Sequence, residues 1–281
     1  GERNWKENMT ILSGEISPKA DDSSRMKFHN ENSFDVVRLF DPDEKTVLDG
    51  FTITGGRATL MDHEEEGQRN AEVTKANKER VGGGIYVKFN EDDSSGPVLQ
   101  NLIITENMAV YGGGIAYELG EGPDITCKLS NVIFTKNLAA SYGGGFFCQP
   151  LSHRSINLEL DNITCRGNVA FRGAGVAVGA VRALVDQLHI GIEVKIENST
   201  FTGNLAETGG GAIYVANNKY VRIANSISWN NWSINRESGQ LPAVIAAEMI
   251  FENTLGEISS CICSEPKIFA HGSSHVEKSE I

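Results

Sequence analysis

The sequence predicts an all-β fold in which short strands stack as the successive coils of a solenoid. Three observations lead there: a segment of about 30 residues recurs along the chain, no segment keeps the 3.6-residue period of a helix over a useful length, and asparagine and glycine return at fixed places in each copy. One such copy cannot bury its inner face alone, so copies must stack and share one core. We therefore expect a single elongated domain rather than two compact ones.

Each copy of the repeat follows one pattern. An aliphatic residue is followed two positions later by asparagine, then by an apolar residue, a second asparagine and a glycine-rich triplet that precedes a short alternating strand. The complete copies begin at Leu99, Leu129, Leu160 and Ile196, and degenerate copies begin at Val47, Ile223 and Ile258. Each copy holds about three short strands and three turns, which is one coil of a parallel β-helix, and we expect about seven coils in all.

Two asparagine columns and the glycine triplets are expected at the corners of the coil. Stacked amide side chains can hydrogen-bond to the amides above and below them, and asparagine tolerates the left-handed backbone of a tight turn. Glycine supplies positive φ at a sharp corner and lets one backbone pass close to the next. The first column is Asn101, Asn131, Asn162, Asn198 and Asn225, and the second is Asn107, Asn137, Asn168, Asn204 and Asn231.

Apolar columns are expected to fill the interior. Cys165 takes the place that Phe134 and Phe201 hold in neighbouring copies, which indicates a small buried hydrophobic residue. Cys127 and Cys148 are interpreted in the same way. The five cysteines are odd in number and mostly far apart, so neither a disulfide framework nor a metal site is predicted.

The charge of the chain argues against some partners. The formal net charge is −12, which is unfavourable for nucleic acid because phosphate binding needs a basic face. No stretch approaches the roughly 20 apolar residues of a membrane-spanning helix, so no membrane span is expected in this chain. No cofactor is predicted. Acidic residues at 62–66, at Asp41 and Asp43, and at 90–96 could recruit Ca²⁺, although none has the spacing of an EF-hand loop.

The coil is expected to span residues 1–265. Insertions at 59–80, 179–195 and 232–247 interrupt it, and residues 266–281 are expected to form a polar C-terminal tail. Such loops on a rigid solenoid often form one wall of a binding groove. The abrupt start and the polar tail would fit a segment of a larger protein.

The repeats resemble those of known bacterial families. The pieces FTKN (134–137), FTGN (201–204) and GGAI (210–213) are similar to the FxxN and GGA[ILV] repeats of chlamydial polymorphic outer-membrane proteins. The opening RNWKENMTILSGEI (3–16) resembles the start of β-helix domains in surface proteins of Bacteroidetes. The combined pattern resembles secreted proteins of the pectin-lyase-like superfamily. This resemblance, over residues 3–265, implies a single-stranded right-handed parallel β-helix that is secreted or displayed on a bacterial surface.

Enzymes of that superfamily carry NTD, DD, GHG and RIK motifs or a cluster of calcium-binding aspartates. NTD, GHG and RIK are not found here, and the DD pairs at 21–22 and 92–93 stand without them. Because the inward columns fill the core, function is expected on outward columns and in the insertions. The residue before each triplet forms one such column: Val81, Tyr111, Tyr142, Arg172 and Thr208. Tyr111 and Tyr142 could stack on sugar rings and Arg172 could pair with a uronate or sulfate, or the three could only cover the glycine turn. Trp229 and Trp232 are interpreted as end caps of the core, with a sugar platform as the alternative.

Three functions are compatible with these features. The first is a noncatalytic surface or adhesion module that binds a polysaccharide along one flank. The second is a polysaccharide lyase or glycoside hydrolase with a non-standard active site, built from Lys136, Arg166 and Arg172 or from the pair Asp161 and Glu197. The third is a structural stalk. The sequence leaves open whether the chain is an enzyme.

Overall fold

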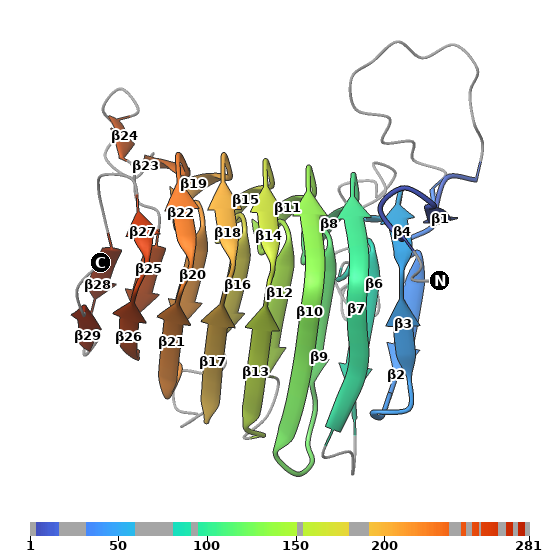
Figure 1. Cartoon of the computed structure of the whole chain (residues 1–281), viewed down its shortest axis with the longest axis horizontal. Helices are drawn as coiled ribbons and strands as arrows, with labels where there is room; N and C mark the ends of the chain where they lie inside the picture. The colour runs from blue at the N-terminus through green and yellow to red at the C-terminus, as the bar shows by residue number, and fades with distance from the viewer. Residues whose placement is uncertain are drawn as a thin grey trace, which may run out of the picture.

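The computed structural model describes residues 4–16, 32–59, 81–90, 95–150, 154–179, 191–235, 243–245, 249–252, 254–263, 268–271 and 275–278. Within these ranges the regular structure is all β-strand, without a helix, and the strands form three sheets, called A, B and C below. Figure 1 shows the strands side by side in one long stack, from the N-terminal end to the C-terminal end.

Sheet A is the largest of the three. It contains β1 (Thr10–Ser13), β3 (Val47–Asp49), β4 (Phe51–Thr54), β7 (Ser95–Thr105), β10 (Ile125–Thr135), β13 (Ile156–Asp161), β14 (Thr164–Arg166), β17 (Ile192–Glu197), β18 (Thr200–Thr202), β21 (Tyr220–Ala224), β22 (Ile227–Trp229), β26 (Leu255–Ser259), β27 (Ile262–Cys263) and β29 (His275–Lys278). Two of its strands, β7 and β10, run through the position where later copies break into two strands, such as β13 and β14.

Sheets B and C complete the coil. Sheet B contains β2 (Val37–Phe40), β6 (Ile85–Phe89), β9 (Ile115–Leu119), β12 (Phe146–Pro150), β16 (Val176–Gly179), β20 (Ile213–Ala216), β25 (Met249–Glu252) and β28 (Ile268–His271). Sheet C contains β5 (Arg57–Ala58), β8 (Met108–Tyr111), β11 (Leu138–Tyr142), β15 (Val169–Arg172), β19 (Leu205–Gly209), β23 (Trp232–Asn235) and β24 (Ala243–Ile245).

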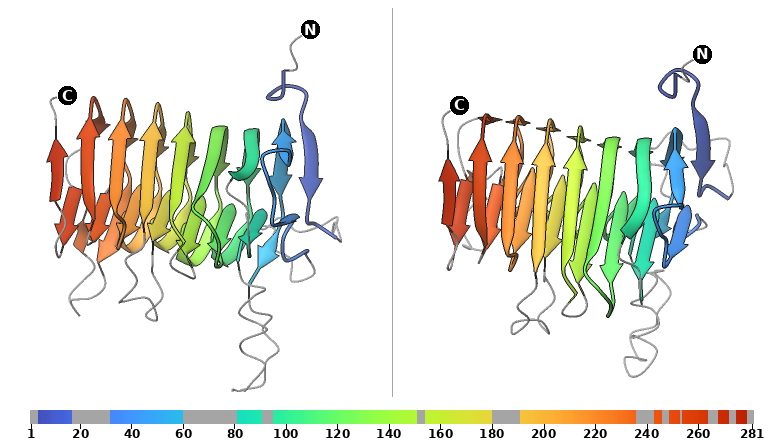
Figure 2. Two further views of the ribbon diagram at one scale, coloured as in Figure 1. Left: turned by 90° about the horizontal axis from the view of Figure 1, so that it is seen from below. Right: turned by 60° about the horizontal axis from the view of Figure 1, so that its bottom comes forward.

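Each copy visits the sheets in the order A, C, B. The chain passes from β7 through β8 to β9 and then returns to sheet A with β10, directly beside β7. Strands pair in parallel with the matching strand of the next copy, except that β24 pairs antiparallel with β23. Figure 2 shows this stacking from two further directions. The all-β class and the parallel stacking predicted from the repeat are therefore confirmed.

The core follows the predicted inward columns. Ile104, Phe134, Cys165 and Phe201 face one another in register across four copies, and each is fully buried. Burial raises the pKa of the Cys165 thiol, as it does for Cys127 and Cys148. These cysteines act as small hydrophobic residues, as expected, and none of the five forms a disulfide.

The expected insertions and tail differ in part from the structure. Gly179 ends β16 and residues 192–195 lie in β17, while 60–80 and 180–190 lie outside the described residues. Strands β23 and β24 lie within 232–247. In the segment expected to be a tail, β28 and β29 pair in parallel with β25 and β26, so both strands belong to the stack. The repeat pattern missed them because they lack its asparagine and glycine positions.

Candidate functional site

The predicted binding column lies where the chain turns from sheet C into sheet B, and the glycine triplets form that turn. The first glycine of each triplet has a left-handed backbone, with φ of +64° at Gly112 and +69° at Gly143. The second glycine lies against the next coil: a Cβ added at Gly113 would lie 2.4 Å from the carbonyl oxygen of Leu138. The triplet therefore allows both the sharp corner and the close stacking of coils.

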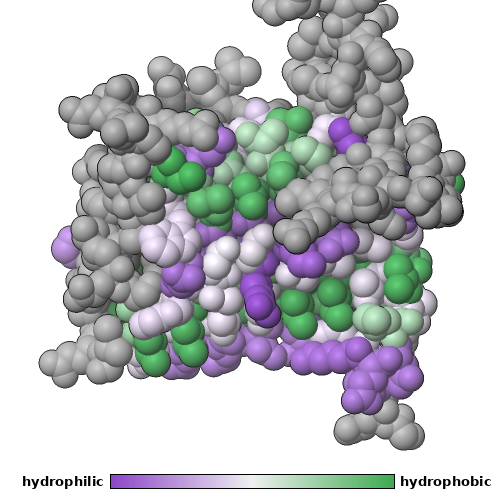
Figure 3. All heavy atoms as spheres, turned by 90° about the horizontal axis from the view of Figure 1, so that it is seen from above, coloured by the Kyte–Doolittle hydropathy of each residue, from purple (hydrophilic) through white to green (hydrophobic). Residues whose placement is uncertain are grey.

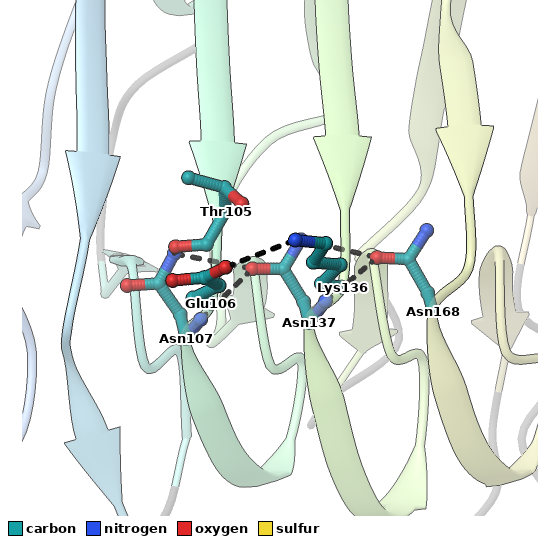
Figure 4. Close-up of polar contacts among 6 residues, drawn as sticks. All are labelled: Thr105, Glu106, Asn107, Lys136, Asn137 and Asn168. Atoms are coloured by element: carbon teal, nitrogen blue, oxygen red, sulfur yellow. Dashed lines mark hydrogen bonds and ion pairs between the residues drawn. The ribbon is translucent and has the colours of Figure 1, made fainter. Parts of the chain in front are cut away.

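The opposite end of sheet C is held by the second asparagine column (Figure 4). The backbone N–H and the side-chain Nδ2 of Asn107 both donate to Oδ1 of Asn137, at 3.1 Å. Asn137 donates in the same way to Asn168, at 3.0 and 3.1 Å, and its Nδ2 also donates to the carbonyl oxygen of Ile104 at 2.8 Å. Asn204 and Asn231 continue the ladder, and all five side chains are buried. The register between coils is thus specified by buried amides.

The first asparagine column forms a second ladder on the surface. These residues have left-handed backbones, with φ between +50° and +55°. Asn131 donates to Asn101 at 3.1 Å and Asn162 donates to Asn131 at 2.6 Å, but Asn198 donates to Asp161 instead. At the buried ladder the left-handed residue is the one before the asparagine, for example Lys136 with φ +57°. The buried ladder therefore forms over all five predicted residues, whereas the surface ladder of amides runs only from Asn101 to Asn162.

The predicted site residues lie together at the end of sheet C. Tyr142 is in register with Tyr111 on one side and Arg172 on the other, and all three side chains are half-buried. The rings of Tyr111 and Tyr142 are nearly parallel, at 5°, with centroids 6.3 Å apart. Gly209 rather than Thr208 is the next member of the column, because Gly210 is the left-handed corner glycine of that copy. The sequence GGGA at 209–212 allowed either alignment.

The column packs against aromatic residues on the outer face of sheet B. Phe147 is buried, with its ring centroid 5.5 Å from that of Tyr111 and 6.3 Å from that of Tyr142. Arg172 lies over the ring of Tyr214 at 5.5 Å, and its Nη1 donates to the Tyr214 hydroxyl at 3.3 Å. The sequence analysis did not predict this aromatic layer. The pattern that could have indicated it is the aromatic residue at the outward position of β12 and of β20, namely Phe147 and Tyr214.

A short polar row continues beside this layer on sheet B. The hydroxyl of Tyr86 donates to Oε2 of Glu118 at 2.7 Å, and burial, followed by the Glu118 charge, raises the pKa of Tyr86. Gln149 follows Glu118 in register and is 1% exposed. Among the residues that the structure describes, neither atom of the Gln149 amide has a hydrogen-bond partner.

The outer faces of the sheets differ in character. The first outward column of sheet C is apolar and in register: Met108, Leu138, Val169, Leu205 and Trp232. Figure 3 looks down from above, the side where the labelled strands of sheet C lie in Figure 1, and shows apolar clusters there between polar ones. Trp229 and Trp232 are 54% and 41% exposed, which does not fit end caps of the core.

Lys136, Asp161 and Glu197, from the enzymatic alternative, have structural partners. Lys136 pairs with Glu106 at 3.3 Å, and it lies at the opposite end of sheet C from Arg172. Asp161 and Glu197 do face each other across adjacent strands, as expected. Asp161 accepts a hydrogen bond from Asn198 at 2.7 Å, however, and Glu197 pairs with Lys195 at 2.9 Å.

The possible calcium ligands were also located. Asp41 accepts hydrogen bonds from the backbone and side chain of Asn90, and Asp43 accepts from the backbone of Lys45 at 3.0 Å. Residues 62–66 lie outside the described ranges. Within those ranges no three or more His, Cys, Asp or Glu side chains gather as metal ligands would. The described residues also contain no helix long and apolar enough to cross a membrane.

Comparison with known proteins finds a match for two copies of the repeat. The model of the Chlamydia polymorphic membrane protein (Chlamydia_PMP) repeat matches residues 131–149 and 198–216. Both stretches run from an asparagine of the surface ladder, through the buried asparagine and the corner glycines, to the following strand of sheet B. The chain is thus a parallel β repeat protein that is similar to that repeat at these two places. No curated protein and no solved structure matches the chain.

Proposed function

We propose that this chain is a bacterial cell-surface module that binds a polysaccharide through the column of Tyr111, Tyr142 and Arg172, in adhesion or surface recognition. The observation that supports it is the near-parallel pair of tyrosine rings, in register and half-buried, with an arginine next in the column. Sugar rings pack on aromatic faces, and arginine recognises acidic substituents. A polymer following the column would meet a new side chain every ~4.8 Å.

The location and the handedness belong to the same proposal. The repeat that matches at two places is described as that of a membrane protein, which supports the outer membrane or the cell surface, or secretion, as the place of this chain. We infer that the coil is right-handed, with about seven turns, as in the pectin-lyase-like proteins that the repeat pattern resembles.

Binding to a panel of neutral and uronate-containing polysaccharides tests this function. Tyr142→Ala removes one stacked ring and should weaken binding of every polymer that binds about two- to tenfold. Arg172→Gln should weaken binding of acidic polymers more than binding of neutral ones. Ile227→Ala is the control, because Ile227 is exposed on sheet A, away from the column. Circular dichroism melting confirms that each variant is folded.

Two results would reject the proposal. One is the absence of binding to every polymer of the panel, and the other is equal binding by wild type and folded Tyr142→Ala. Assaying the same mixtures for unsaturated products and new reducing ends tests the enzymatic alternative, and the binding function predicts neither product.

A further inference from the structure

A groove runs over the outer face of sheet A, well away from the tyrosine column. It has a volume of about 270 Å³ and crosses the strands β10, β13, β17 and β21. The polar residues that line it are Thr126, Asn157, Glu159, Glu193, Lys195, Tyr220 and Arg222. These residues come from four successive copies of the repeat, so the groove exists only in the stacked coil.

Strand register arranges these side chains as two parallel rows. Residues two apart in a strand point to the same face, and matching residues of adjacent strands lie ~4.8 Å apart. The first row is Thr126, Asn157, Glu193, Tyr220 and Leu255, and the second row is Lys128, Glu159, Lys195, Arg222 and Glu257. The groove follows these rows along the axis of the stack.

Most of the charges on this face are already paired. The ion pairs are Lys128 with Glu159 at 2.8 Å, Lys219 with Glu193 at 2.6 Å, and Lys195 with Glu197 at 2.9 Å. Glu257 accepts a hydrogen bond from the hydroxyl of Tyr220 at 3.1 Å. Arg222 is exposed and, over the part of the chain that the structure describes, its guanidinium has neither an ion-pair nor a hydrogen-bond partner.

Two cations lie next to each other in the second row. Lys195 and Arg222 are in register on β17 and β21, and Glu257 follows Arg222 on β26. Lys195 pairs with Glu197, and Glu257 accepts from Tyr220. A bound anion would therefore give Arg222 the partner it lacks. Because the whole chain carries a net charge of −12, it does not attract anions in general, so this local pair of cations is the feature that would select them.

We propose that this groove binds a short stretch of an anionic saccharide, with its carboxylate or sulfate on Arg222 and Lys195. Arginine binds both groups through two parallel hydrogen bonds. Asn157 and Glu193 face the groove with amide and carboxylate groups that bond sugar hydroxyls, and Tyr220, 37% exposed, offers a ring for packing. The volume lies just below that of common ligand pockets, which suits about one or two sugar units. The inference goes beyond the proposed function, because this groove and the tyrosine column lie on different sheets.

Calorimetric titration of the whole chain with three tetrasaccharides tests the inference: one of uronic acids, one sulfated and one neutral. Wild type should bind at least one charged probe, more weakly as salt rises, and any binding of the neutral probe should be lost in Tyr142→Ala. Arg222→Gln should lower the affinity about tenfold or more, since it removes a charged bidentate contact. Arg166→Gln is the matched control, because Arg166 is also exposed on sheet A but does not line the groove, and it should change affinity less than about twofold.

The charged probe that binds more tightly identifies the group on Arg222 as a carboxylate or a sulfate. The inference is overturned if neither charged probe binds, if Arg222→Gln binds like wild type, or if Arg166→Gln loses as much affinity as Arg222→Gln. Both arginines are exposed, so both variants should melt like wild type. Arg222→Gln should lower binding of the charged probe by the same factor in the Tyr142→Ala background, so failure of this site and failure of the proposed polymer site give different results.

Discussion

Two rows of asparagine run through the same coils, and they differ in how deeply they are buried. In each complete copy the two residues are six positions apart, as in Asn131 and Asn137. The surface row is exposed or half-exposed, and its chain of hydrogen bonds changes partner at Asp161. The buried row is unbroken, and each amide also bonds a strand carbonyl. From this difference we infer that burial, rather than stacking alone, makes an amide important for stability. A buried group that loses its hydrogen-bond partner cannot bond to water instead.

The largest effect is expected for Asn137→Ala. The change removes the acceptor of the backbone N–H of Asn107 and the donor to the carbonyl oxygen of Ile104, both in the interior, while Nδ2 of Asn107 keeps the carbonyl oxygens of Ile53 and Thr105. Each buried group left unsatisfied costs about 1–3 kcal/mol, so we expect the free energy of unfolding to fall by about 3 kcal/mol or more. Urea unfolding followed by circular dichroism measures this loss. A loss below about 1 kcal/mol would contradict the importance given to the buried row.

The corner glycines also differ in how closely neighbouring atoms surround them. Gly143 and Gly167 both have a left-handed backbone, but a Cβ at Gly143 would lie 2.4 Å from the Phe146 carbonyl oxygen, whereas a Cβ at Gly167 meets nothing within 4 Å. Gly167→Ala should therefore cost about 1 kcal/mol, from backbone strain alone, and Gly143→Ala about 2 kcal/mol or more. Thermal melting of the two variants measures the gap, and equal melting temperatures would show that the crowded corner relaxes.

Buried and exposed groups should also differ in their response to pH. The raised pKa of Cys165 keeps its thiol protonated in the folded chain, while in the unfolded chain it ionises near pH 8.5. The stabilisation is present below pH 8.5 and is lost as pH rises above it, by about 1.4 kcal/mol at pH 9.5 for one thiol. Comparing the free energies of unfolding of wild type and Cys165→Val at pH 7.5 and 9.5 isolates the contribution of the Cys165 thiol. A pH slope that is the same in both proteins would show that Cys165 does not contribute.

The smallest effect is expected in the surface row. Asn131→Gly keeps the left-handed backbone and removes the hydrogen bonds to Asn101 and from Asn162, which water replaces at this exposed position. We expect the free energy of unfolding to fall by less than about 1 kcal/mol. Glycine rather than alanine is the suitable replacement, because alanine would add backbone strain at φ +55°. Urea unfolding under the conditions used for Asn137→Ala measures it.

Much of the fold could be read from the repeat. The columns of the core, both asparagine ladders and the register of Tyr111, Tyr142 and Arg172 follow from spacing, because stacked copies place equal positions side by side. Spacing could not tell which asparagine row is buried, since the rows carry the same residue and the same interval. How deeply a residue is buried depends on where the coil turns, and the turns are fixed only when all three sheets have formed.

The groove on sheet A could not be predicted from the sequence, for a related reason. Its character depends on which charges pair, and the partners of Lys128 and Lys219 come from neighbouring copies about 30 residues away. Arg222 lies in a degenerate copy, where the pattern gives little guidance on register. Glu197, an acidic residue on the neighbouring strand, pairs with Lys195 of its own strand rather than with Arg222.

The most direct test of the contrast compares the two rows within one coil. Asn168 belongs to the buried row, where it links Asn137 and Asn204, and Asn162 belongs to the surface row, where it bonds Asn131. Urea unfolding of Asn168→Ala and Asn162→Gly, side by side with wild type, should show the first variant losing at least about 2 kcal/mol more than the second. Equal losses, or a larger loss for Asn162→Gly, would contradict the conclusion that burial decides which ladder holds the coils together.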